Sequence, residues 1–306
     1  MDVAIMIEGQ NGLTWSRWQR LAAAVEDLRF AALYRSDHFT NMNPPDKPSL
    51  ELWVSLTWLA GHTRRIPFGP LVTPMSFRHP VMTARMATAV DDLSGGRLTL
   101  GVGAGWQQRE HTSYGFDLLD MRGRFARLEE ALRIITHLLQ RDDPLTFHGT
   151  YYRLQDAMLL PRPQRPGGPP ILIGGNGLRR TLPLAARFAR EWNAVFAPPE
   201  KFAELSACLD ALAQKHGRNP GEIRRSLMTG LVFGRDDQQV QQRLAGRDVA
   251  QLRQRGVMVG TPSQVVDQVG PLAEAGVQRV MLQWLELDDL DGLELLAQTL
   301  LPQVPR

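Results

Sequence analysis

The sequence lacks the features that mark secreted, disulfide-bonded and membrane-spanning proteins. It contains one cysteine, Cys208, so no disulfide can form within the chain, and this favours a reducing, cytoplasmic location. Nowhere do about 18 apolar residues run together, as a membrane-spanning helix would require. The first residues show no basic leader followed by an apolar segment of signal-peptide length. We therefore expect a soluble cytoplasmic protein without a membrane partner.

Lysine is also scarce, although basic residues as a class are not. Only Lys47, Lys201 and Lys215 are lysines among 35 basic residues, and the formal net charge is +3. This charge is too small over 306 residues to indicate a nucleic-acid partner. The excess of arginine has two interpretations that composition cannot separate, a bias of the genome and a need for many guanidinium contacts.

Several catalytic signatures are missing. The sequence has no Gly-Lys-Ser/Thr phosphate loop, which argues against nucleoside triphosphate chemistry, and no Gly-x-Ser-x-Gly nucleophile motif. Histidine, cysteine and carboxylate residues nowhere have the spacing of metal ligands, so we expect no bound metal. Cys208 lies in a helical pattern and is interpreted as a packed apolar side chain rather than a nucleophile.

What the sequence does contain is a regular alternation of short apolar runs with longer stretches of helical period. This pattern indicates repeated βαβ units and a parallel sheet. Eight strands in order, each followed by a helix, predict an α/β fold of the (β/α)8 TIM-barrel type, since a doubly wound sheet usually needs only about five to seven strands. The predicted strands are residues 3–7, 31–34, 66–73, 97–102, 171–173, 192–196, 226–233 and 277–282.

Residues 141–170 interrupt this alternation. Residues 146–154 are predicted to form a small hairpin around His148-Gly149, and a proline-rich connector follows. The alternation resumes at residue 171, so we interpret 141–170 as an insertion rather than a linker between domains. The prediction is a single barrel domain over residues 1–306, with insertions after the fourth and seventh strands.

In such a barrel the active site lies at the carboxyl ends of the strands. The second predicted strand is followed by Ser36-Asp37-His38-Phe39. An imidazole that titrates near neutral pH, with a carboxylate close by, suits proton transfer at a reacting centre. Adjacent strand residues point to opposite faces, so Asp37 need not touch His38 directly. We predict that His38 and Asp37 are catalytic, and the alternative is a histidine that only packs or lies on the surface.

The fifth predicted strand is followed by Gly174-Gly175-Asn176-Gly177, and then by Arg179-Arg180 where a helix begins. Free backbone N–H groups, the positive end of a helix and two guanidinium groups together favour an anion. The pattern predicts a phosphate site, and the alternative is a tight glycine turn without a ligand.

The loops after the third and fourth strands, residues 69–74 and 101–106, are rich in glycine and proline. Turn chemistry alone could explain them. The functional interpretation is a backbone bulge placed against a flat ring in the first loop, and close approach of backbone to a ligand in the second. The Gly-x-Gly-x-Gly spacing, with a long loop before the next helix, is not a dinucleotide fingerprint.

Several short stretches of the sequence, each of them weak evidence alone, together form a specific pattern. They are Met6-Ile7-Glu8-Gly9-Gln10, Arg35-Ser36-Asp37-His38-Phe39, Val72-Thr73-Pro74, Arg78-His79-Pro80, Asp91-Asp92-Leu93-Ser94-Gly95-Gly96-Arg97, Gly101-Val102-Gly103-Ala104-Gly105-Trp106, Arg124-Phe125, Leu128-Glu129-Glu130-Ala131-Leu132 and Pro169-Pro170-Ile171-Leu172-Ile173-Gly174-Gly175. Together they resemble the luciferase-like flavin-dependent oxidoreductases (bacterial luciferase-like monooxygenases), specifically the branch that uses the deazaflavin coenzyme F-420. The resemblance covers most of the chain from residue 5 to about residue 192 and then weakens.

The resemblance implies a cofactor in the barrel mouth and roles for particular residues. Asp37 would contact the deazaflavin ring, and His38 would be the proton donor or acceptor. A non-proline cis peptide would fall near Pro70-Leu71 and press on the ring face. The family's Ala-Asp before Trp-Asn is Ala189-Arg190-Glu191 here, which argues against an acidic contact at that point. The remaining implied contacts to ring or phosphate are Thr73, Gly105, Trp106, Gly174, Gly175, Asn176, Gly177 and Trp192.

These implications predict an oxidoreductase that passes hydride between coenzyme F-420 and a small organic substrate, while His38 supplies or removes the accompanying proton. The nearest alternative is an FMN-dependent monooxygenase that uses reduced flavin and O2, because the two cofactors share a tricyclic ring and a ribityl phosphate. A non-catalytic flavin-binding barrel is a second alternative, which has no need of a titrating pair beside the ring. Similar proteins are commonly dimers, so we also expect a homodimer.

The substrate itself is not predicted by the sequence. The loops expected to cover it, about 38–48, 107–121 and 235–260, are long and follow no recognisable polar pattern. They contain Met42, Met121, Met258 and Phe116, which favours an adaptable and partly apolar pocket.

Overall fold

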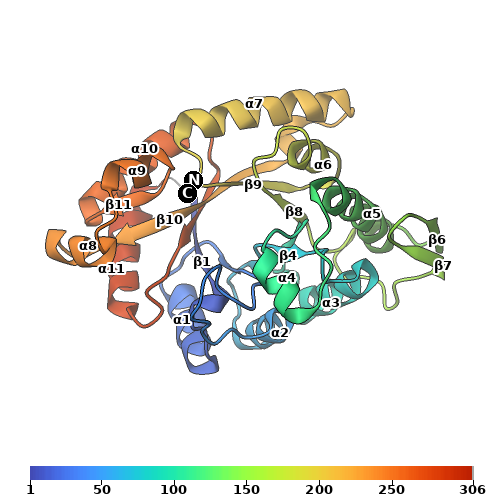
Figure 1. Cartoon of the computed structure of the whole chain (residues 1–306), viewed down its shortest axis with the longest axis horizontal. Coiled ribbons are helices and arrows are strands. Elements are labelled where there is room, and N and C mark those ends of the chain that lie inside the picture. The colour runs from blue at the N-terminus through green and yellow to red at the C-terminus, as the bar shows by residue number, and fades with distance from the viewer. Residues whose placement is uncertain (305–306) are drawn as a thin grey trace.

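The computed structural model describes residues 1–304, and its strands form a parallel sheet that curves almost into a closed barrel (Figure 1). The strands follow the order β3-β2-β1-β12-β10-β9-β8-β5-β4, and a bridge between Phe68 and Leu98 brings the two ends of the sheet together. The predicted barrel is thereby confirmed. Its strands are β1 (Asp2–Ile7), β2 (Leu33–Arg35), β3 (Phe68–Pro70), β4 (Thr73–Pro74), β5 (Leu100–Gly103), β8 (Ile171–Gly174), β9 (Glu191–Val195), β10 (Arg224–Phe233) and β12 (Arg279–Gln283).

Helices surround this sheet because each presents one apolar face to it (Figure 1). In α5 this face contains Leu128, Leu132, Ile135 and Leu139, which are all buried. A capping box begins α10, in which the side chains of Thr261 and Gln264 each bond the backbone of the other residue. The longer helices are α1 (Trp15–Asp27), α2 (Leu52–His62), α3 (Pro80–Leu93), α5 (Met121–Gln140), α6 (Thr181–Phe188), α7 (Pro199–Lys215), α10 (Pro262–Glu274) and α11 (Leu290–Leu300).

The loops differ from the expectation in two places. The loop expected over about 235–260 contains two short helices, α8 (Asp237–Leu244) and α9 (Val249–Gln254), which are separated because Ala245 and Gly246 both adopt left-handed backbone angles, with φ of 49° and 80°. A short strand, β11 (Met258–Gly260), then pairs with the end of β10. The sequence did not predict β11, because three residues are too few to show the alternation of apolar and polar residues that indicates a strand.

Another short helix, α4 (Gln108–Tyr114), lies in the loop after β5. Between α5 and β8 the chain forms an antiparallel hairpin, β6 (Leu145–His148) with β7 (Arg153–Ala157). It lies beyond α5, outside the barrel (Figure 1). The carboxylate of Glu130 on α5 accepts hydrogen bonds from the backbone N–H groups of 150–152 and so fixes the turn of the hairpin.

The amino-terminal end of the barrel holds a buried ion pair. Nη1 of Arg279 donates to Oε2 of Glu191 at 2.9 Å and to the Tyr34 hydroxyl at 2.8 Å. Burial raises the pKa of Tyr34 to about 12. Glu191, which stands at the start of β9, therefore belongs to the end of the barrel opposite the predicted site. Within residues 1–304 no helix has the length and apolar character needed to cross a membrane.

Candidate active site

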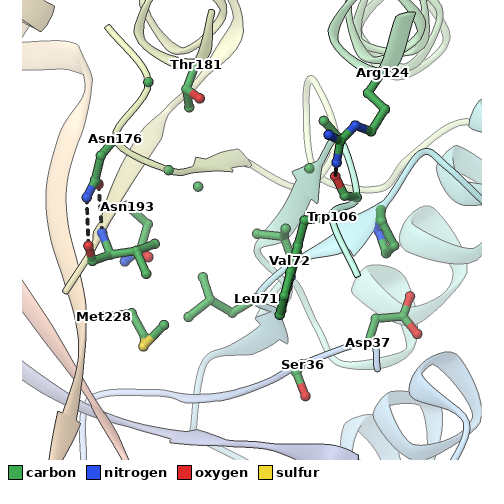
Figure 2. A pocket seen from close by; sticks show the side chains of 18 of the residues that line it. Ser36, Asp37, Leu71, Val72, Trp106, Arg124, Asn176, Thr181, Asn193 and Met228 are labelled. Carbon is green, nitrogen blue, oxygen red and sulfur yellow. Dashed lines mark hydrogen bonds between the residues drawn. The ribbon is translucent and has the colours of Figure 1, made fainter. Parts of the chain in front are cut away.

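A cavity of about 880 Å³ opens at the carboxyl ends of the strands. Its wall is built from the segments that follow β2, the β3–β4 break, β5, β8 and β9, together with the start of α5 (Figure 2). Most predicted site residues lie on this wall. Those that line it are Asp37, His38, Leu71, Gly105, Trp106, Gly174, Gly175, Asn176 and Gly177, while Pro70, Thr73 and Trp192 do not.

His38 is paired with a carboxylate that the sequence did not indicate. Its Nδ1–H donates to Oε1 of Glu110 at 3.1 Å, and Glu110 is buried. The same carboxylate accepts from the backbone N–H of Phe39, so it fixes both the ring and the chain beside it. Glu110 is in α4, which folds back over the end of β2. Glu110 is 72 residues from His38 in the sequence, in a loop whose structure was not predicted. The only local sign of a functional residue there was the nearby motif that ends at Trp106.

The environment favours the protonated form of His38. Burial alone lowers the pKa of this imidazole, but the hydrogen bond to Glu110 and the negative charge of Glu110 outweigh burial. The net result is a pKa raised above the ordinary value of 6.5. A histidine tuned in this way can carry a proton at neutral pH and release it to a reacting atom.

Replacing Glu110 by Gln should lower the pKa of His38, because burial persists while the hydrogen bond to the carboxylate and its negative charge are lost. In the native protein, the ion pair contributes to the free energy of unfolding fully below pH 6.5. This contribution is lost as pH rises through the raised folded-state pKa. Proton NMR titration of the His38 ring in both proteins measures the shift. An unchanged His38 pKa in the variant contradicts the assignment of Glu110 as its partner.

Asp37 lies on the cavity wall but does not hydrogen-bond to His38 within the described chain. Its Oδ1 accepts from Nη2 of Arg78 at 2.8 Å, and its Oδ2 accepts from Nε of Arg78 and the hydroxyl of Thr73 at 3.0 and 2.8 Å. Thr73 orients this carboxylate, and its contact with the cofactor stays a prediction. Asp37 is therefore held in place by Arg78 and Thr73, and the carboxylate that pairs with His38 is that of Glu110.

The non-proline cis peptide predicted near Pro70-Leu71 is present, and it lies one residue further on, between Leu71 and Val72. The reason is that Pro70 still belongs to β3, and the Leu71 N–H donates to the carbonyl of Arg35 in the ladder with β2. The bulge therefore begins after Leu71. Leu71 and Val72 both face the cavity (Figure 2).

Two glycines of the next strand are required by this bulge rather than by a ligand. A Cβ on Gly101 would stand 2.1 Å from the carbonyl oxygen of Pro70, and a Cβ on Gly103 would stand 2.5 Å from Cγ2 of Val72. Neither position has room for a side chain, so glycine is required at both. The Gly-x-Gly-x-Gly pattern therefore seats the bulge against β5, and only its last glycine, Gly105, with φ of 80°, turns the chain into the loop.

The glycine turn after β8 is held by hydrogen bonds to β9. Asn176 exchanges two hydrogen bonds with the backbone of Val195, at 2.7 and 2.9 Å (Figure 2). Trp192 is buried beneath the turn and donates from Nε1 to the carbonyl of Gly175 at 2.9 Å. Asn176 and Trp192 thus support the turn. The backbone N–H groups of Gly177 and Leu178 donate to no residue within 1–304.

Positive charge gathers at the same end of the cavity. Arg179 and Arg180 line it, are exposed, and form no ion pair with a described residue. They immediately precede the positive end of α6. Unpaired guanidinium groups beside free N–H groups make an anion site. No group of three or more histidine, cysteine or carboxylate residues in 1–304 could hold a metal ion.

The cavity therefore brings the His38–Glu110 pair and the unpaired guanidinium groups of Arg179 and Arg180 to the mouth of one barrel, at the end where barrel enzymes have their active sites. The family model described as luciferase-like monooxygenase matches residues 1–254, and the chain belongs to that family.

Relatives of two kinds are similar to this sequence. An F420-dependent glucose-6-phosphate dehydrogenase of Kineococcus radiotolerans is 31% identical over 224 residues, covering 71% of this chain and 64% of that enzyme. Its counterpart in Amycolatopsis mediterranei is 25% identical over 319 residues, covering 92% of both chains. A 4-hydroxyprotoasukamycin monooxygenase of Streptomyces nodosus subsp. asukaensis is 33% identical over 184 residues, covering 60% of this chain and 47% of that enzyme. The matches thus span less than two thirds of the Kineococcus and Streptomyces enzymes.

Solved structures share the fold over the full chain. An F420-dependent secondary alcohol dehydrogenase in complex with an F420-acetone adduct superposes with a TM-score of 0.88, at 18% identity, covering 100% of this chain and 99% of that one. The coenzyme F420-dependent tetrahydromethanopterin reductase of Methanopyrus kandleri superposes with a TM-score of 0.80, at 20% identity, covering 100% of both chains. At these identities the likeness concerns the fold.

Proposed function

We propose that the protein is an oxidoreductase that transfers hydride between the deazaflavin coenzyme F-420 and a small organic substrate. The observation that carries the proposal is the cavity itself. The buried His38–Glu110 pair and the free guanidinium groups of Arg179 and Arg180 line one continuous wall. Such a wall suits a long cofactor whose anionic end is held at one place and whose ring meets the substrate at another.

The lining also fits a ring that carries both N–H and C=O groups. Two of its buried atoms, Nε of Arg124 and Oδ1 of Asn193, have no hydrogen-bond partner within the described chain. A donor and an acceptor left in this state favour a ligand that supplies the complement. Leu71 and Val72 provide an apolar surface for the ring, and the glycine turn with Arg179 and Arg180 would hold the phosphate.

When bound, the cofactor supplies or accepts the hydride. The residues of the chain orient the reactants and move the proton. His38 holds this proton on its imidazole, and Glu110 fixes the ring through Nδ1, which leaves Nε2 for the reacting group. Asp37, bonded to Arg78 and Thr73, keeps the loop after β2 in place.

Coenzyme F-420 is preferred over FMN for two reasons. Its oligoglutamyl tail carries more negative charge than a single phosphate, and the arginines beside the glycine turn provide the complement. The names of the Kineococcus and Amycolatopsis relatives point to the same cofactor. An FMN-dependent monooxygenase remains the second candidate, which the Streptomyces relative favours.

Fluorescence titration of the purified protein with coenzyme F-420 and with FMN, side by side, tests the proposal. We expect tight binding of coenzyme F-420, and about tenfold weaker binding when Arg179 and Arg180 are both replaced by Gln, because two charge-assisted contacts are lost. Added salt should weaken the native interaction. Arg153→Gln, on the distant hairpin, is the matched control and should change nothing. Tight binding of FMN alone overturns the preference for coenzyme F-420.

We further propose that the protein is a cytoplasmic homodimer. The neighbouring helices α2 and α3 expose Val54, Met82 and Leu93. Large apolar side chains on adjacent helices support an interface with a second copy. The single cysteine, which needs no oxidising compartment, supports the cytoplasmic location.

A further inference from the structure

One part of the cavity wall is apolar and open to solvent. Trp106 has an exposed fraction of 55%, although it is among the largest apolar side chains of the chain. Met121 and Leu178, which also line the cavity, have exposed fractions of 46% and 51%. Large apolar side chains that are exposed to solvent around one cavity indicate a binding site, because a bound ligand would bury them. The rim formed by Trp106, Met121 and Leu178 is hereafter called the apolar rim.

Trp106 stands beside His38. The centroids of its ring and the His38 ring are 5.4 Å apart, with an interplanar angle of 82°. Figure 2 shows the indole of Trp106 edge-on between Asp37 and Leu71, so that the flat faces of the ring are turned toward the pocket. A group lying on that face is next to His38.

The indole is held by the residues on each side of it. The carbonyl of Gly105 accepts from Nη1 of Arg124 at 3.0 Å. The side chain of Gln107 donates to the carbonyl of Thr40 at 2.7 Å. Backbone fixed at both neighbours makes the loop a firm support, which favours a rigid flat partner over a flexible one.

The carboxylates on this side of the cavity already have partners. Asp37 is bonded to Arg78 and Thr73, and Glu8 accepts from the side chains of Gln10 and Gln283. Arg124 forms no ion pair with a described residue; its Nη1 is bonded to the carbonyl of Gly105, and its unpartnered Nε is assigned above to the cofactor ring. The free guanidinium groups, Arg179 and Arg180, belong to the glycine turn. With the cofactor on Arg124, a charged substrate would find no free counter-ion beside Trp106.

We propose that the substrate is an uncharged, mainly apolar molecule that lays a flat aromatic or conjugated group on Trp106, with its reacting carbon next to His38. A sugar phosphate is then not the substrate, in contrast to the relatives named for glucose 6-phosphate. This assigns Trp106 to the substrate instead of the cofactor contact that the family resemblance implies. The proposal rests on the proposed function for the reaction, but its binding part can be tested without turnover.

Three probes separate shape from charge: 2-acetylnaphthalene, a flat aromatic ketone; methyl cyclohexyl ketone, a saturated one; and glucose 6-phosphate. Their dissociation constants are measured by saturation-transfer NMR on the protein alone and on the protein loaded with coenzyme F-420. The variants are Trp106→Ala and Trp106→Phe. Trp15→Ala, which removes an exposed tryptophan of α1 outside the cavity, is the matched control.

We expect the native protein to bind the aromatic ketone most tightly. Trp106→Ala should weaken that binding by about tenfold and the saturated ketone by about twofold or less, because stacking adds to simple burial. Trp106→Phe should restore most of the loss, Trp15→Ala should have no effect, and cofactor affinity should stay the same in all three variants.

Three results would overturn the proposal: preferential binding of glucose 6-phosphate, equal losses for the two ketones in Trp106→Ala, or a loss confined to cofactor affinity. The proposed function fails separately. A protein that takes up no cofactor but still binds the aromatic ketone through Trp106 leaves this inference intact and removes the assigned reaction.

Discussion

Replacing His38 by Ala should lower turnover by about 10²–10⁴-fold, while the affinity for the cofactor stays nearly the same. The expected size of the effect follows from the place of the imidazole. It lines the cavity, is held by Glu110 at 3.1 Å, and carries a raised pKa, so its loss removes the group that moves the proton but no part of the glycine turn. Steady-state kinetics with the loaded protein measures turnover, and fluorescence titration measures cofactor affinity.

The matched control for this prediction is His62→Ala. His62 lies at the end of α2, where its ring stacks on Trp58, away from the cavity. Its replacement should leave turnover unchanged. Glu110→Gln should reduce turnover less than His38→Ala does, and should move the optimum of the pH profile downward, because His38 loses its proton at lower pH. Full turnover of His38→Ala would remove this histidine from the mechanism.

The sequence predicted the parts of the site that depend on local pattern. His38, the glycine turn and the eight barrel strands each follow from a short stretch in which periodicity or turn chemistry is sufficient. Glu110 could not be found in this way, because its contact with His38 depends on how α4 folds over the end of β2. The partnership of Asp37 with Arg78 was missed for a similar reason, since it joins two loops 41 residues apart.

Glycines and prolines around the β3–β4 break show a second limit. Their pattern indicated a tight backbone, but not which partner the backbone approaches. Gly101 approaches the carbonyl of Pro70 at the end of β3, and Gly103 approaches the side chain of Val72 in the bulge. A glycine in the sequence indicates that a side chain has no room at that position. Only the structure shows which neighbouring atoms occupy the space.

Replacing Arg279 by Met should produce the largest loss of stability, about 3–5 kcal/mol of the free energy of unfolding. Arg279 and Glu191 are both buried, and their pairing at 2.9 Å is the main compensation for taking two charges out of water. With Arg279 gone, the carboxylate of Glu191 keeps its cost of burial and loses its partner. Chemical denaturation followed by circular dichroism measures the change.

The double variant Arg279→Met with Glu191→Gln is the informative control. It removes both charges, so no carboxylate is left uncompensated, and part of the lost stability should return. At a temperature where both variants remain folded, turnover should equal that of the native protein, because the ion pair lies at the amino ends of β9 and β12 and the cavity at the carboxyl ends. A single variant as stable as the native chain would show that the pair contributes little. A stable variant with reduced turnover would instead mean that the two ends of the barrel are coupled, contrary to the division of roles that the structure supports.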